Sequence, residues 1–258
     1  MTPLLAFPLG ATLALAAWGA RSLDRSGAIA AAAVGGGVLW GAGWWGGAIL
    51  LTFFVGSTVV SRLCPDPAAL MGEAKGGRRD AGQVLANGGA PALGALLGLH
   101  EPSAGFWVLS IGLATAAADT WATALGATSP SAPRHLLRWE TVPAGTSGGV
   151  TWRGTLGGVL GALSVGTVGW GATSDRRLLV AAGIIGTAGM LFDSLLGATL
   201  QGRFHCDACR VATERPLHRC GAPARAVGGR RWLTNDGVNG LTTCLATLAG
   251  WALVVSMS

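Results

Sequence analysis

Three aspartates stand in or beside apolar stretches of this 258-residue chain. Asp119 lies in LSIGLATAAADTWATALGA, Asp193 lies in AAGIIGTAGMLFDSLLGATL, and Asp236 opens NDGVNGLTTCLATLAGWALVVSM. A carboxylate at membrane depth costs several kcal/mol unless it faces a polar cavity or a partner. Carboxylate and phosphate oxygens are the ligands that Mg²⁺ prefers. The three aspartates therefore predict a site for a divalent cation and the phosphates that it carries.

A basic loop opens the stretch GEAKGGRRDAGQVLANGG and precedes the apolar segment 82–99. Arginine binds phosphate oxygens in bidentate fashion and lysine acts as a point charge, so Lys75, Arg78 and Arg79 can grip phosphates. Gln83 and Asn87 share one face of the following helix, where two amides need hydrogen-bond partners. The alternative is an ordinary basic loop of a membrane protein. The two amides favour a binding site.

Two polar stripes surround the first two aspartates. In ADTWATALG, Thr120 and Thr123 accompany Asp119. The second stripe, in FDSLLGATLQGR, comprises Asp193, Ser194, Gly197 and Gln201. Asp119 has a structural alternative, a hydrogen bond to a hydroxyl or an arginine of a neighbouring helix. The cost of an intramembrane carboxylate favours a functional role.

A glycine-rich loop, TVPAGTSGGVTWRGTLGG, precedes the sixth segment. Gly145, Gly148 and Gly149 free the backbone around Thr146 and Ser147, so that N–H groups and hydroxyls can cradle phosphates before a helix. A plain turn is the alternative. The loop is not a P-loop, because GxxxxGK[ST] is absent.

Oxygen ligands also open the last segment, NDGVNG. Asn235, Asp236 and Asn239 stand there at a helix start on the predicted cytoplasmic side. Capping of the helix by Asn235 or Asp236 is the alternative, because both residue types are favoured at that position.

The segment CDACRVATERPLHRC offers four zinc ligands: Cys206, Cys209, His218 and Cys220. Thiolates and imidazole in a tetrahedral cage are typical of structural zinc. A disulfide is disfavoured on a reducing cytosolic side. His205 can replace His218 as the fourth ligand.

Composition indicates an all-α, polytopic membrane protein. The chain is 50% hydrophobic and only 12% charged, whereas a soluble domain carries about 25% charged residues. Apolar runs long enough to span a bilayer recur throughout. We predict about eight transmembrane helices, over 3–20, 26–41, 45–63, 82–99, 103–127, 154–173, 178–201 and 236–256.

The basic residues test this topology. With eight helices, sixteen of the eighteen Lys and Arg residues fall on one side, and only Arg176 and Arg177 fall on the other. The positive-inside rule makes the first side cytoplasmic. We therefore expect one domain, 1–258, in the cell membrane, with long cytoplasmic loops and the Cys/His loop 202–235 inserted before the last helix. The charge predicts contact with anionic headgroups or phosphorylated ligands, and no nucleic-acid partner.

Together these motifs resemble the integral-membrane family that contains plant phytyl-phosphate kinase. The matching stretches are GGRRDAGQVLANGG, ADTWATALG, VPAGTSGGVTWRGTLGG, FDSLLGATLQ and NDGVNGLTT. More distantly, the layout is similar to two CTP-dependent membrane enzymes, dolichol kinase and phosphatidate cytidylyltransferase. The Cys/His segment occurs in only part of the family, which favours a structural insert.

The resemblance implies a membrane-embedded phosphotransferase. It would move a phosphoryl group from a nucleoside triphosphate, with CTP expected, to an isoprenyl or phytyl monophosphate. Asp119, Asp193 and Asp236 would hold Mg²⁺, while Lys75 and Arg79 would neutralise phosphate charge beside the catalytic Asp119 and Asp193. Candidates for substrate and nucleotide binding are Arg78, Gln83, Asn87, Thr123, Thr146, Ser147, Gly148, Gly149, Asn235 and Asn239. The alternatives are a CTP-dependent cytidylyltransferase that makes a CDP-lipid, and a lipid or small-molecule transporter.

Overall fold

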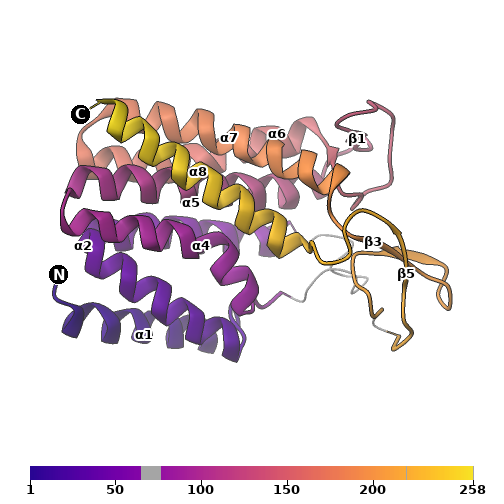
Figure 1. Ribbon diagram of the computed structural model, residues 1–258, viewed down its shortest axis with the longest axis horizontal. Helices are drawn as coiled ribbons and strands as arrows, with labels where there is room; N and C mark the ends of the chain where they lie inside the picture. The colour runs from indigo at the N-terminus through magenta and orange to yellow at the C-terminus, as the bar shows by residue number, and fades with distance from the viewer. Residues whose placement is uncertain (65–76, 219, 258) are drawn as a thin grey trace.

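The protein is a bundle of apolar helices with small β-structures at one end (Figure 1). The computed structural model describes residues 1–64, 77–218 and 220–257. Its helices are α1 (Pro3–Gly19), α2 (Arg25–Leu63), α4 (Ala81–Ala95), the 3₁₀ helix η1 (Leu96–Leu99), α5 (Pro102–Ala127), α6 (Trp152–Thr173), α7 (Arg176–Thr199) and α8 (Asn235–Met257). Five of them, α2, α5, α6, α7 and α8, are long and apolar enough to cross a membrane. The predicted helical membrane architecture is confirmed.

Helix α2 covers two of the predicted segments, because the chain turns back inside it. Gly43 has φ 60° and ψ −152°, a conformation outside the helical region that glycine adopts without a Cβ penalty. At the far end, Arg62 donates from Nη2 to Ala20 O at 2.8 Å, so the last turn of α2 returns to the residues that precede its first turn. All eight predicted segments are therefore helical, while eight separate membrane crossings remain a prediction.

Helix α5 is the central element and packs against α2, α4, α6, α7 and α8. Small residues allow the closest of these approaches, as in other membrane bundles. A Cβ added to Gly157 or Gly161 of α6 would lie within 3 Å of the α5 backbone oxygens of Trp121 and Ala117. This close packing fixes α5, and with it Asp119, relative to the surrounding helices.

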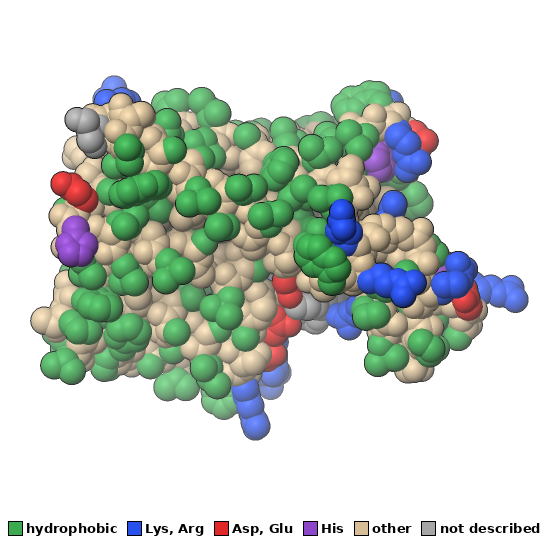
Figure 2. All heavy atoms as spheres, viewed as in Figure 1, with side chains coloured by type: hydrophobic (Ala, Val, Ile, Leu, Met, Phe, Trp, Pro, Cys, Tyr) green, Lys and Arg blue, Asp and Glu red, His purple; other side chains and the backbone are tan. Residues whose placement is uncertain are grey.

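The connections that follow α1, α2, α5 and α7 meet at one end of the bundle. Arg79 N donates to Ser22 O at 3.0 Å, which joins the first two of these connections. Ser147 Oγ donates to Glu214 Oε1 at 2.5 Å, which joins the last two. Figure 2 shows many Lys and Arg side chains at this end, around β3 and β5. Arg176 and Arg177 begin α7 at the opposite end, as the predicted topology requires.

Two small antiparallel sheets lie within the connections, where the sequence analysis expected only loops. Strand β1 (Arg134–His135) pairs with β2 (Gly149–Val150). The second sheet has the order β4-β3-β5, with β3 (Arg203–Cys206), β4 (Val211–Thr213) and β5 (Arg225–Gly228). Strands of two to four residues are too short to show an alternating pattern of polar and apolar residues, so the sequence did not reveal them.

Candidate functional site

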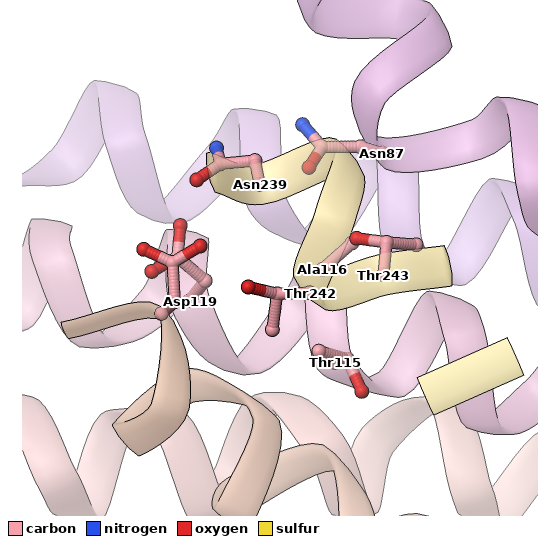
Figure 3. A pocket seen from close by; sticks show the side chains of 8 residues that line it. Asn87, Thr115, Ala116, Asp119, Asn239, Thr242 and Thr243 are labelled. Carbon is pink, nitrogen blue, oxygen red and sulfur yellow. The ribbon is translucent and has the colours of Figure 1, made fainter. Parts of the chain in front are cut away.

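Asp119 and Asp193 meet inside the bundle. Asp119 comes from α5 and Asp193 from α7, and both line one narrow cavity with residues of α4 and α8. Asp193 is 9% exposed, and the negative charge of Asp119 acts on it directly. Figure 3 shows Asp119 facing the same space as Asn239 and Thr242. Two acidic motifs separated by more than seventy residues of sequence thus form one buried acidic pair.

Two amides and several hydroxyls complete the lining. Asn87 enters from α4 and Asn239 from α8 (Figure 3). The buried Oδ1 atom of Asn239 accepts no hydrogen bond within the part of the chain that the structure describes. The other lining residues are Thr115, Ala116, Thr242 and Thr243. An unpartnered amide oxygen beside two carboxylates makes this an oxygen-rich site short of positive charge.

The sequence analysis missed the threonines, although helical periodicity could have found them. Thr115 lies four residues before Asp119, and Thr243 lies four residues after Asn239. Residues at this spacing share one face of a helix. The hydroxyls of Thr115 and Thr242 donate hydrogen bonds to backbone carbonyls one turn earlier in their helices, at 3.1 and 2.9 Å.

The lining side chains nearly fill the cavity. No separate water molecule fits between the side chains that line it. A cation and a phosphate group can enter only if the lining helices separate or the side chains rotate. The structure therefore corresponds to a closed form of the site.

Asp236 does not line this cavity, so the expected convergence of three aspartates is only partly realised. Asp236 lies in the first turn of α8, and its Oδ2 is 2.9 Å from the position that a Cβ on Gly82 would take. It therefore faces the start of α4, near Asp80, rather than Asp119. Asn235, the first residue of α8, is exposed.

The two arginines of the basic loop lie in different environments. Arg79 stacks its guanidinium over the rings of Phe53 and Phe54, at 5.5 and 5.3 Å. Burial lowers the pKa of Arg79 to about 10, so the side chain is cationic at neutral pH. Arg78 is exposed and its charge acts on Asp24. Lys75 lies outside the described residues.

Gln83 has a structural role that the sequence analysis did not assign. Its Oε1 accepts from Asp80 N at 3.2 Å, and Asp80 Oδ1 accepts from Gln83 N at 2.9 Å. This reciprocal arrangement is a capping box, which satisfies the free N–H groups at the start of α4. Of the two predicted amides, only Asn87, one turn further into the helix, reaches the cavity.

The glycine-rich loop lies directly on the end of α7. Gly148 has φ +81°, and a Cβ added there would lie 2.4 Å from Ala198 Cβ and 3.1 Å from Ser194 O. Thr146 donates its hydroxyl to Pro143 O at 2.7 Å, and Gly149 N donates to Thr146 O at 2.9 Å. Since Ser194 follows Asp193, the structure brings the glycine-rich loop against the polar stripe of FDSLLGATLQGR. Thr123, by contrast, is exposed and lies outside the cavity lining.

The Cys/His loop holds four ligand atoms in position for a metal ion. The Sγ atoms of Cys206, Cys209 and Cys220 and a ring nitrogen of His218 all lie within 4.8 Å of one another. The structure selects His218 over His205, which lies outside this cluster and 3.9 Å from Asp207. Soft thiolates and an imidazole at this spacing fit zinc.

The local electrostatics favour thiolate formation at one ligand. A hydrogen bond from His218 lowers the pKa of the Cys220 thiol to about 6, and the Nδ1–Sγ distance is 3.0 Å. A hydrogen bond involving Cys220 raises the pKa of Cys209 to about 11. A bound cation would deprotonate the remaining thiols, since metal ligation requires thiolates.

Removal of two ligands should remove the metal. We expect purified protein with the paired change Cys206→Ser and Cys209→Ser to lose zinc, because a site with one thiolate and one imidazole binds zinc far more weakly than a four-ligand cage. Elemental analysis of the purified protein measures this. Cys64→Ser and Cys244→Ser are the matched controls, because both residues lie outside the cluster. Equal zinc content in the paired variant and in these controls would contradict the metal site.

Comparisons with known proteins agree with the fold. The family model "Integral membrane protein DUF92" matches residues 8–247. An uncharacterized membrane protein of Methanocaldococcus jannaschii is 37% identical over 196 residues, which are 73% of this chain and 79% of that protein. Protein PGR of Arabidopsis thaliana is 31% identical over 141 residues, 50% of this chain and 48% of its own length. No solved structure matches the chain significantly. The chain therefore belongs to the DUF92 family of integral membrane proteins.

Proposed function

We propose that this protein is a membrane-embedded phosphotransferase whose buried acidic pair holds Mg²⁺ and the phosphates of a nucleoside triphosphate. The observation that carries the proposal is the convergence of Asp119, Asp193 and the unpartnered Asn239 Oδ1 on one cavity. Two adjacent buried carboxylates repel each other, and a divalent cation is the group that relieves the repulsion. Three oxygens of this kind fit Mg²⁺, which takes the rest of its six ligands from water and substrate phosphates.

The surrounding residues suit a phosphate donor. The loop of Thr146, Ser147 and Gly148 lies against α7 within one turn of Asp193. Thr146 donates within the loop, so the backbone N–H groups of Ser147 and Gly148 and the Ser147 hydroxyl would bind the phosphates. Bound Mg²⁺ would neutralise the charge that develops on the donor phosphates. Asn87 would complete the binding of the donor from the α4 side.

Arg79 is suited to bind the phosphate of the lipid that accepts the phosphoryl group. Its guanidinium makes no hydrogen bond or ion pair with a described residue and contacts two aromatic rings of α2. A cation held on an apolar surface is well placed for a lipid that ends in a phosphate. Lys75, which we keep as a candidate from the sequence, would add a second positive charge.

The reaction follows from these roles. An oxygen of the acceptor monophosphate attacks the γ-phosphorus of the donor, the bond to the β,γ-bridging oxygen breaks, and the nucleoside diphosphate leaves. The product is the lipid diphosphate. A phosphate oxygen is already nucleophilic, so the site needs positioning and charge neutralisation rather than a strong general base. From the family resemblance we propose CTP as donor and an isoprenyl or phytyl monophosphate as acceptor, with the tail between the helices.

Two isotopic labels test the proposal. Purified protein in detergent is incubated with Mg²⁺, phytyl or farnesyl phosphate, and CTP labelled in either the γ- or the α-phosphate. We expect the γ-label to appear in the lipid, with turnover on the order of 1–100 per second, as is typical of kinases. Transfer of the α-label would indicate cytidylyltransferase chemistry instead. No nucleotide turnover with a panel of isoprenyl phosphates would contradict the enzyme and favour the transporter.

A further inference from the structure

A contact between two distant loops links the metal cluster to the glycine-rich loop. Ser147 Oγ donates to Glu214 Oε1 at 2.5 Å, across 67 residues of sequence. A short hydrogen bond to a carboxylate is among the stronger side-chain contacts. Neither the resemblance nor the sequence motifs give Glu214 a role. Its charge also acts on Asp193, so Glu214 lies within electrostatic range of the acidic site.

The metal ligands hold the chain on both sides of Glu214. Cys206 and Cys209 precede it, and His218 and Cys220 follow it, so a metal that binds all four closes a loop around the segment. Closing a loop in this way reduces the conformational freedom of the residues inside it. Glu214 itself is exposed, and Ser147 is the side-chain hydrogen-bond partner that it has among the described residues.

The rest of the Cys/His loop is fixed to the bundle. Arg230 N donates to Leu200 O at 2.8 Å, and Gly202 N donates to Leu233 O at 2.9 Å. These bonds tie the loop to the end of α7 and to the start of α8. Thr213, buried at 7% exposure, pairs with Phe204 on β3 and sets the point at which Glu214 leaves the sheet. The metal site, β4 and Glu214 therefore form one continuous support between the end of α7 and the start of α8.

We propose that Glu214 is a positioning residue that the metal-bound Cys/His loop holds against Ser147, so that metal binding orders the glycine-rich loop beside Asp193. The mechanical coupling does not depend on the chemistry of the site. Its consequence, better placement of the loop for phosphate binding, rests on the function proposed above. An arriving phosphate oxygen would accept the hydrogen bond from the Ser147 hydroxyl in place of Glu214, so Glu214 orients the hydroxyl before the phosphate binds.

Hydrogen exchange in the protein without nucleotide tests the coupling. The reporters are the amides of Leu136 and Gly149, which bond to Gly148 O and Thr146 O at 2.9 Å each. Removal of the metal by a chelator, verified by elemental analysis, should speed their exchange about threefold to tenfold, the factor expected for loss of one solvent-exposed hydrogen bond. Glu214→Ala should show the faster exchange while still holding metal, and Glu214→Gln, which keeps the acceptor oxygen, should not. Glu140→Ala is the control, because Glu140 pairs with Arg138 at 2.9 Å in the same connection.

Two results would overturn the proposal. Unchanged exchange in metal-loaded Glu214→Ala would show that Glu214 does not order the loop. An equal further increase on metal removal from that variant would show that the metal acts by another route. In the turnover assay, Glu214→Ala should raise the KM for CTP about threefold to tenfold, by the same reasoning, with kcat little changed. Absence of turnover in the unaltered protein would refute the proposed function and leave the exchange result standing.

Discussion

Replacing Asp193 with asparagine should abolish turnover and make the cation-free protein more stable. The carboxylate is 9% exposed and next to Asp119, so in the absence of a cation the folded protein must either bear a buried charge or bind a proton, and both cost stability. Asparagine keeps the shape and removes the charge, which relieves the repulsion. We expect activity to fall about 100-fold or more, as when a transition-state contact is lost. A gain of about 2 kcal/mol would raise the melting temperature by roughly 4–8 °C for a chain of this size.

The opposite signs of these two effects distinguish a functional carboxylate from a structural one. A structural Asp193 would stabilise the fold, and its removal would lower the melting temperature. Thermal unfolding in detergent, with and without Mg²⁺, measures the difference. Mg²⁺ should raise the melting temperature of the unaltered protein and leave that of Asp193→Asn unchanged, because binding to the folded state alone stabilises it.

Asp175→Asn is the matched control on the same helix. Asp175 caps the other end of α7 and accepts from Arg177 N at 2.9 Å. Asparagine keeps the capping oxygen and loses only the ion pair with the exposed Arg177, so stability should fall by less than about 1 kcal/mol, with activity and the response to Mg²⁺ retained. Asp119→Asn should behave like Asp193→Asn, and the double variant should lose little more activity than either, because the two residues act as a unit. Full activity in both single variants would eliminate the proposed cation site.

Placing a methyl group on Gly148 should inactivate the protein while leaving the bundle folded. A Cβ at this position would lie 2.4 Å from Ala198 Cβ and 3.0 Å from Ala198 Cα, so either the loop or α7 must move. The backbone also has φ +81°, which disfavours alanine. Because the loop is held beside Ser194, its displacement would move the hydroxyls and N–H groups of residues 146–149 away from the end of α7 that carries Asp193. A misplacement of about 1 Å can cost about 100-fold in rate, and we expect a loss of kcat/KM of that order for Gly148→Ala.

A second substitution makes this prediction specific. Ala198→Gly removes the atom that the new methyl group would meet first, so Gly148→Ala with Ala198→Gly should recover part of the lost kcat/KM. Gly43→Ala is the control for backbone strain, because Gly43 also has positive φ but has open space around its Cβ position. Turnover assays and size-exclusion profiles of the three variants measure activity and folding. Retained activity in Gly148→Ala alone would show that the loop does not serve the reaction.

The apolar pattern of the sequence determined the helices. Runs of Leu, Val, Ala and Gly long enough to cross a bilayer allow only backbone that satisfies its own hydrogen bonds, and the segment bounds follow from that requirement. The predicted segment 154–173 is α6 (Trp152–Thr173), and 236–256 is α8 (Asn235–Met257). The Cys/His ligand set was also readable, because its four residues stand within fifteen positions of one another and need only a local turn to meet.

Only the tertiary structure decided which polar residues share a site. Helical spacing placed Gln83 and Asn87 on one face, yet Gln83 caps α4 while Asn87 lines the cavity. The position of Asp236 at a helix start already separated it from Asp119 and Asp193, but only the packing of α8 shows that Asn239 shares the cavity with Asp119 while Asp236 lies beside Gly82.

The sequence also could not predict the contact between Ser147 and Glu214, because it joins two loops that no periodic pattern relates. Periodicity within a helix records which face is polar, because each residue advances by a fixed angle. It carries no information on which other helix or loop that face will meet, because packing of small residues along α5 and α6 sets those distances. The sequence therefore determined the helices, their polar faces and the local metal ligands, and the packing of the bundle selected the buried pair of Asp119 and Asp193 and its support by Glu214.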